Sequence, residues 1–154
     1  MKRLKMLLPS DSCIDLIKQF EGFSSKAYPD STGVYTIGFG TICYPNGKKV
    51  RLSDPECTKE QATEWLQNDL KRFVVALNDM LKVDLPQNKF DALCSLIYNI
   101  GPTNLKSSTL MKKLNKEDFA GASLEFLKWN KAGNVIIPGL VNRRFAEKKV
   151  FDGT

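Results

Sequence analysis

Two carboxylates and a hydroxyl stand close together in the first third of the chain. Glu21 precedes a glycine, Asp30 comes nine residues later, and Thr36 lies in a glycine-rich segment just beyond. Cleavage of a glycosidic bond requires one protonated carboxylic acid and one ionised carboxylate, held apart on rigid elements. The sequence therefore predicts that Glu21 and Asp30 form such a pair.

The absence of histidine from the 154 residues restricts the chemistry. Ser-His-Asp and Cys-His nucleophilic catalysis in their usual forms are excluded, as is the His-ligated zinc of hydrolases. The four cysteines (Cys13, Cys43, Cys57 and Cys94) contain no C-x-x-C pair, which argues against a zinc ribbon or redox motif. We expect neither a metal nor a cofactor, and carboxylates remain the leading acid–base groups.

The net charge is +6, from 23 Lys and Arg against 17 Asp and Glu. Such basicity suggests a polyanionic partner (nucleic acid, an anionic envelope polymer or a lipid surface), although a merely basic soluble protein is an equal alternative. The apolar run within Met1–Pro9 is too short for a signal peptide, and no later stretch reaches the length of a membrane span. We therefore expect synthesis in the cytoplasm and no stable membrane insertion.

A short helix is predicted to carry the glutamate. A capping box at Ser12–Asp15 opens the helical pattern, and Gly22 is a suitable residue for its end. Glu21 would then lie at the negative end of the helix, where a charged carboxylate is disfavoured. This position suits an acid that must keep its proton.

Residues 24–57 are predicted to form a small β region, with a hairpin turn at Pro45–Gly47 and a returning strand at Lys48–Leu52. Strand alternation puts Thr36 on one face with two glycines, whereas Tyr35, Ile37 and Phe39 form a core-facing set. The glycine face has no bulk, so we expect it to admit a ligand ring.

The rest of the chain is predicted to be helical, which makes the fold α+β. Within a single domain, 1–154, we expect an N-terminal lobe at about 10–57, a linking helix at about 58–82 that begins with a capping box at Thr58–Gln61, and a helical lobe at about 86–152. The last helix is rich in basic residues, and its apolar residues are expected to face a core. A groove between lobes is a natural polymer site.

In their order and spacing these motifs resemble the phage-type lysozymes, the endolysin muramidases of glycoside hydrolase family 24. The motifs are Phe20–Gly22, Asp30, Thr36–Gly40, Phe90–Leu93, Tyr98–Gly101, Ser107–Leu110 and Gly139–Arg144. The resemblance covers about Leu16–Phe151. It implies a lysozyme-like fold, with a small β-containing N-terminal lobe and a helical C-terminal lobe joined by a long helix and a cleft between them.

The resemblance also implies an activity: hydrolysis of the β-1,4 bond between N-acetylmuramic acid and N-acetylglucosamine of peptidoglycan, which lyses the bacterial host. Glu21 is then the general acid, Asp30 activates or orients water, and Thr36 helps to hold that water. A water between two carboxylates favours inversion at the anomeric carbon. Arg143, or Arg144 next to it, corresponds to an arginine that pairs with the acid from the opposite lobe.

Substrate contacts carry over to a further set of residues by the same resemblance: Ile42, Tyr98, Asn99, Thr109 (or Ser108) and Arg143. Thr41 stands where some members have histidine, so any buried ion pair built on that histidine is absent. The family further implies dependence on a separate pore-forming holin and action on the wall after the membrane is permeabilised. We expect a monomer without a nucleic-acid partner.

Three alternatives remain open at the level of sequence. A lytic transglycosylase would cut the same bond without water and would not need Asp30 and Thr36, and a chitinase-like specificity is a weaker variant of the same doubt. A non-catalytic cationic protein could bind the envelope through an amphipathic segment at Asn142–Lys149.

Cys43 and Cys57 flank a hairpin-like loop and could form a disulfide if the protein acts in an oxidising compartment.

Overall fold

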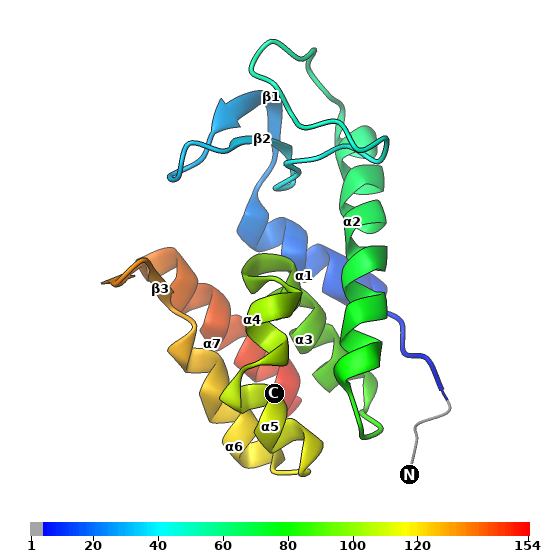
Figure 1. The fold of residues 1–154 in the computed structure, drawn as a ribbon, viewed down its shortest axis with the longest axis vertical. Helices are drawn as coiled ribbons and strands as arrows, with labels where there is room; N and C mark the ends of the chain where they lie inside the picture. The colour runs from blue at the N-terminus through cyan, green and yellow to red at the C-terminus, as the bar shows by residue number, and fades with distance from the viewer. Residues whose placement is uncertain (1–4) are drawn as a thin grey trace. The chain divides into compact units, whose positions relative to one another are not determined.

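The computed structural model describes residues 5–154, which consist mainly of helices with two small antiparallel sheets (Figure 1). The chain forms two compact units. One is Asp15–Arg72, called here the β-containing unit, and the other combines Met1–Ile14 with Phe73–Thr154 and is called the helical unit. Helices α1 (Asp11–Glu21) and α2 (Lys59–Met80) each contribute residues to both units.

Helix α1 begins earlier than predicted, because Ser10 rather than Ser12 caps it. The Cys13 N–H donates to Ser10 Oγ at 3.4 Å, and the Ile14 N–H donates to the Ser10 carbonyl at 3.3 Å. Asp91 fixes this cap by accepting from the Ser10 N–H at 3.0 Å, a long-range contact that no local pattern indicates. The predicted end is confirmed, since Gly22 follows Glu21 with a φ of +70°.

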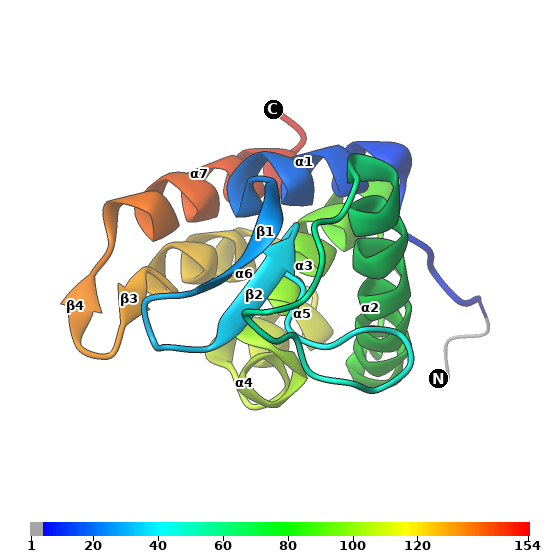
Figure 2. The same ribbon diagram turned by 90° about the horizontal axis from the view of Figure 1, so that it is seen from above.

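The β-containing unit holds strands β1 (Ser24–Pro29) and β2 (Tyr35–Gly38), an antiparallel pair in which Tyr28 lies opposite Thr36 (Figure 2). Ile37 and Phe39 are buried as predicted. Tyr35 is 42% exposed, so its assignment to the core is wrong. It lies at the start of the strand, opposite Pro29, where the sheet is open to solvent.

The loop after β2 contains the predicted turn but no predicted returning strand. At the turn, the Gly47 N–H donates to the Tyr44 carbonyl at 2.9 Å and the Lys48 N–H to Asn46 Oδ1 at 2.9 Å. Beyond it, Lys48–Leu52 forms only an isolated bridge between Cys43 and Lys49. The chain then enters α2 through the predicted capping box: the Gln61 N–H donates to Thr58 Oγ1 at 3.1 Å, and the Thr58 N–H to Gln61 Oε1 at 3.0 Å.

The helical unit contains the remaining elements: α3 (Gln87–Ile100), α4 (Pro102–Lys106), α5 (Thr109–Asn115), α6 (Phe119–Glu125), the 3-10 turn η1 (Phe126–Lys128), β3 (Lys131–Ala132), β4 (Val135–Ile136) and α7 (Pro138–Asp152). Helices α3 and α7 pack side by side (Figure 1). The segment after α5, expected to be helical, is divided into α6 and η1. The β3–β4 hairpin was not predicted, because two-residue strands leave no periodic signal.

The N-terminal segment is tied to the helical unit. The Leu7 N–H donates to Asn78 Oδ1 at 2.9 Å, and Asn78 Nδ2 returns a hydrogen bond to the Leu7 carbonyl at 3.0 Å. Residues 1–4 of the segment considered above as an export signal lie outside the described residues. Between residues 5 and 154, no helix has the length and apolar character needed to cross a bilayer.

All four cysteines are free thiols in this structure. Cys13, Cys57 and Cys94 are buried, and Cys43 is half-buried. The thiol of Cys43 lies 3.7 Å from the Tyr44 carbonyl, whereas that of Cys57 lies 3.8 Å from the Ser24 carbonyl. A disulfide between Cys43 and Cys57 is therefore not formed here.

Candidate active site

Glu21 is the last residue of α1, and a glycine gives its carboxylate room. Gly40 follows β2 with a φ of +82°, a conformation in which a side chain is strained. A Cβ at Gly40 would lie 2.5 Å from Glu21 Oε1 and 3.1 Å from Glu21 Cδ. The glycine at this position is therefore required both by its backbone conformation and by the carboxylate beside it.

Aromatic side chains pack where the chain passes from α1 to the sheet. The rings of Phe23 and Phe39 lie 5.4 Å apart between centroids. The Lys18 ammonium lies 5.2 Å from the centre of the Phe39 ring, and the Lys59 ammonium lies 5.7 Å from that of Phe23. These contacts hold the turn after Glu21 against the end of β2, which limits the movement of the glutamate.

Asp30 is held as an ionised carboxylate in the turn between β1 and β2. Its Oδ1 accepts three hydrogen bonds: from the Thr32 hydroxyl at 2.7 Å, the Thr32 N–H at 2.8 Å and the Val34 N–H at 2.9 Å. These bonds, above all that from the Thr32 hydroxyl, lower the pKa of Asp30. Asp30 is thus suited to the role of the charged partner.

Val34 connects Asp30 to Thr36. The Val34 carbonyl accepts from both the Asp30 N–H at 2.9 Å and the Thr36 hydroxyl at 3.1 Å. The Val34 N–H, in turn, donates to the Asp30 carboxylate. Thr36 is only 5% exposed. The aspartate and the threonine therefore form one hydrogen-bonded unit with a single residue between them.

Tyr28 is a member of this group that the sequence analysis missed. Burial raises the pKa of its phenol, and the negative charges of Glu21 and Asp30 raise that pKa further. Both carboxylates therefore act on one side chain, which pairs with Thr36 across the sheet. The available signal was its place on β1, two residues before Asp30.

The expectation that the glycine face of β2 receives a ligand ring is wrong. A Cβ at Gly38 would lie 2.9 Å from Ala62 Cβ and 3.6 Å from the Trp65 ring, both on α2. The space where a side chain of residue 40 would lie is likewise occupied by Glu21. The two glycines thus make room for other parts of the protein, which local alternation could not reveal.

The two residues after Gly40, Thr41 and Ile42, differ in burial. Thr41 is fully buried, and its hydroxyl has no hydrogen-bond partner among the described residues. Ile42 is 51% exposed and carries an apolar side chain at the surface, as a contact residue would. Its carbonyl accepts from the Val50 N–H at 3.0 Å, which fixes its position.

The candidate substrate contacts of the helical unit lie on α3, on α5 and, for Arg143, on α7. The Tyr98 ring packs edge-on against Phe73 with centroids 5.8 Å apart, and Asn99 accepts a hydrogen bond from Arg144. Ser108 is buried as the cap of α5, because its hydroxyl accepts from the Met111 N–H at 3.0 Å. The exposed hydroxyl at this helix start is that of Thr109.

The two arginines of α7 are buried around one acid, Glu147. Arg143 Nε lies 3.2 Å from Glu147 Oε2, and Arg144 Nη1 lies 2.5 Å from Glu147 Oε1. The Ser95 hydroxyl donates to the same carboxylate at 2.5 Å. Burial raises the pKa of Glu147, and the charges of Arg144 and Arg143 oppose that rise. Glu147 and Ser95 were not predicted. The i, i+3 and i, i+4 spacing could have indicated Glu147, whereas Ser95 is 48 positions from Arg143 and no local pattern indicates it.

A helical fold with a small sheet, in which the carboxylates of Glu21 and Asp30 both act on Tyr28, is typical of a glycosidase of the lysozyme type. The family model of phage lysozyme matches residues 18–147, and the chain belongs to that family. The family prediction is confirmed.

Individual proteins agree with this assignment. The chain is 42% identical to an endolysin of Acyrthosiphon pisum secondary endosymbiont phage 1, over 93% of this chain and 97% of that one. Among solved structures it resembles an endolysin from Escherichia coli O157:H7 phage FAHEc1, with a TM-score of 0.92, 39% identity and coverage of 99% and 98%. It also resembles a mutant of P22 lysozyme, with a TM-score of 0.82, 37% identity and coverage of 95% and 99%. The predicted lysozyme-like α+β fold is therefore confirmed.

Proposed function

We propose that this lysozyme-family glycosidase is an endolysin that hydrolyses the β-1,4 bond between N-acetylmuramic acid and N-acetylglucosamine in peptidoglycan. Glu21 is the general acid that protonates the leaving oxygen. Asp30 activates a water molecule, and Thr36 helps to orient it. The observation that supports these roles best is the contrast between the two carboxylates, since three hydrogen bonds hold Asp30 ionised while Glu21 lies at the negative end of a helix.

The Val34 linkage supports a role for Asp30 and Thr36 as a unit. The Thr36 hydroxyl donates its hydrogen bond to the Val34 carbonyl. The lone pairs of the Thr36 hydroxyl oxygen therefore remain able to accept a hydrogen bond from water. A water held there and activated by Asp30 would attack the sugar from the face opposite the leaving group, which inverts the anomeric carbon. NMR of the first product should therefore show the α anomer, and a β anomer would contradict this mechanism.

The variant Glu21→Gln tests the assignment of the acid. Glutamine keeps the shape of the side chain but has no proton to donate, so wall lysis should fall by about 100-fold or more. Glu64→Gln, at an exposed position of α2, is the matched control and should leave activity unchanged. More than about a tenth of the activity remaining in Glu21→Gln would overturn the assignment. Anhydro-sugar ends in the digest would instead identify a lytic transglycosylase.

Contacts with the glycan are assigned to five residues: Ile42, Tyr98, Asn99, Thr109 and Arg143. The support differs among them. Ile42 and Thr109 are exposed, whereas Arg143 is buried in the Glu147 network. We therefore propose direct contacts for the exposed side chains and an electrostatic contribution from Arg143.

The protein is further proposed to act as a monomer that is made in the host cytoplasm and reaches the wall through a holin-type pore. The support is its similarity to proteins named as phage endolysins. Expression alone in Gram-negative cells should not lyse them until chloroform or a pore permeabilises the membrane. Spontaneous lysis that azide blocks would show instead that the protein is exported by the host secretion machinery.

A further inference from the structure

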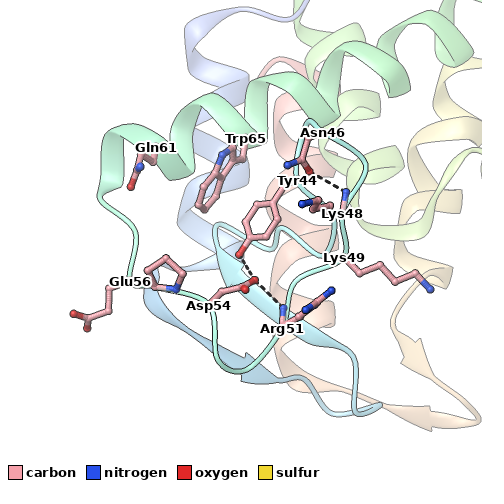
Figure 3. A pocket seen from close by; sticks show the side chains of 10 residues that line it. Tyr44, Asn46, Lys48, Lys49, Arg51, Asp54, Glu56, Gln61 and Trp65 are labelled. Atoms are coloured by element: carbon pink, nitrogen blue, oxygen red, sulfur yellow. Dashed lines mark hydrogen bonds between the residues drawn. The ribbon is translucent and has the colours of Figure 1, made fainter.

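A pocket lies in the β-containing unit, between the first turns of α2 and the loop at 44–56 (Figure 3). Its volume is about 350 Å³. None of Glu21, Asp30 and Thr36 lines it. The pocket is therefore separate in its residues from the site proposed above for hydrolysis.

One wall of the pocket is aromatic and preformed. The rings of Tyr44 and Trp65 meet edge-on, with centroids 5.0 Å apart at 65° (Figure 3). The Tyr44 hydroxyl donates to Asp54 Oδ2 at 2.7 Å, and the backbone N–H of Arg51 donates to the same oxygen at 2.9 Å. These two bonds lower the pKa of Asp54, so the carboxylate stays charged and holds the phenol in place.

Three cationic residues also line the pocket. Lys48, Lys49 and Arg51 lie within four residues of one another and are all exposed. Within the described part of the chain, no carboxylate oxygen lies within 4.0 Å of the charged nitrogens of these three side chains. Of the two acids in the lining, Asp54 is bound to Tyr44, and Glu56 is shared with Lys26 at 3.9 Å. Asp54 also attracts the charge of Arg51. With three cations against two acids, the lining keeps a net positive charge (3 − 2 = +1).

From these contacts we infer that the pocket binds a phosphorylated saccharide, as an accessory carbohydrate site. The C–H face of a sugar ring packs on aromatic side chains, and the amides of Asn46 and Gln61 can bind its hydroxyl or acetamido groups. Three neighbouring cations match a phosphate dianion better than a single carboxylate. The inference does not depend on the proposed catalytic roles.

Titration of the 15N-labelled protein with N-acetylglucosamine 1-phosphate tests the inference, with N-acetylglucosamine and inorganic phosphate as fragment controls. The indole N–H of Trp65 and the amides of Tyr44 and of residues 46–51 should shift, and the indole of Trp129, the other tryptophan of the chain, should not. Because two types of contact are combined, the sugar phosphate should bind at least about tenfold more tightly than either fragment. Equal binding of phosphate alone, or shifts confined to Glu21 and Thr36, would overturn the inference.

Two double variants distinguish binding by the cations of the pocket from a nonspecific effect of the protein's net charge. Lys48→Gln with Arg51→Gln should weaken binding by about fivefold, because two exposed charge contacts are lost. Lys71→Gln with Lys149→Gln changes the net charge equally, from +6 to +4 (6 − 2 = 4), at exposed positions outside the pocket. This control should bind like the wild type, and equal weakening in both double variants would refute the site.

Discussion

Gly40 lies so close to Glu21 that a single added carbon would collide with the carboxylate, at 2.5 Å from Oε1. The end of β2 therefore determines where the proposed acid can lie, although the two residues are far apart in sequence. A side chain at position 40 would therefore displace the Glu21 carboxylate.

Gly40→Ala should reduce lytic activity at least about tenfold by displacing Glu21, since misplacement of a catalytic group by about 1 Å can cost 100-fold. Gly47→Ala is a matched control, because Gly47 has a similar φ of +85° but no atom within 4 Å of its missing Cβ. Both variants should lose about 1 kcal/mol of stability from backbone strain. Turbidity assays and thermal unfolding of both proteins measure the difference, and equal activity in the two would contradict the seating role of Gly40.

Thr32→Val should raise the pKa of Asp30, because the Thr32 hydroxyl makes the largest contribution to lowering it. An aspartate with a lowered pKa in the folded state stabilises the protein above its ordinary pKa, and this contribution is lost as the pH falls through the lowered value. The variant should therefore lose that contribution, and the acidic limb of its activity profile should move to higher pH. Carboxyl 13C NMR titration measures the shift directly, and Ser31→Ala in the same turn should leave it unchanged.

Thr41→Val should stabilise the protein by about 1 kcal/mol, because it replaces a buried hydroxyl that has no partner with a methyl group of the same shape. Thr63→Val is the comparison, since the Thr63 hydroxyl donates to the Lys59 carbonyl at 2.8 Å. Denaturant unfolding should show a gain only for Thr41→Val. A loss of stability there would mean that the hydroxyl is satisfied in solution.

Glu147→Gln should cost at least about 3 kcal/mol of unfolding free energy, because two buried arginines lose their shared counter-charge. Glu125→Gln offers a milder comparison. Its partners Lys113 and Lys128 are 36% and 70% exposed and can turn to water, so about 1 kcal/mol is expected. Equal losses, measured by denaturant titration, would argue against a special role for the buried network.

Features set by neighbouring residues could be predicted from the sequence. The capping box at Thr58–Gln61 and the glycine after Glu21 lie where they were expected, because each depends on contacts within a few residues. Recognition of the family also depended on local motifs. The Ser10 cap could not be found in this way, since Asp91 is 81 positions away.

Helix α7 shows most clearly why features that depend on long-range contacts were not predicted. The apolar residues of this helix were expected to face a core, yet Phe145 is 54% exposed, whereas Arg143 and Arg144 are buried. The two guanidinium groups can be buried because Glu147, Ser95 and the Trp129 carbonyl together supply their charge and hydrogen-bond partners. The partners come from three elements, so no periodicity within α7 could identify the buried face.

The unequal burial of the cysteines has a practical consequence for labelling. Burial raises the pKa of the Cys57 and Cys94 thiols, and Cys13 is equally enclosed, so Cys43 is the accessible thiol of the four. Thiol-reactive reagents attack the exposed thiolate form. A maleimide fluorophore should therefore attach at one native position without mutagenesis. That position is adjacent to Tyr44, so the dye would report directly on occupancy of the aromatic pocket.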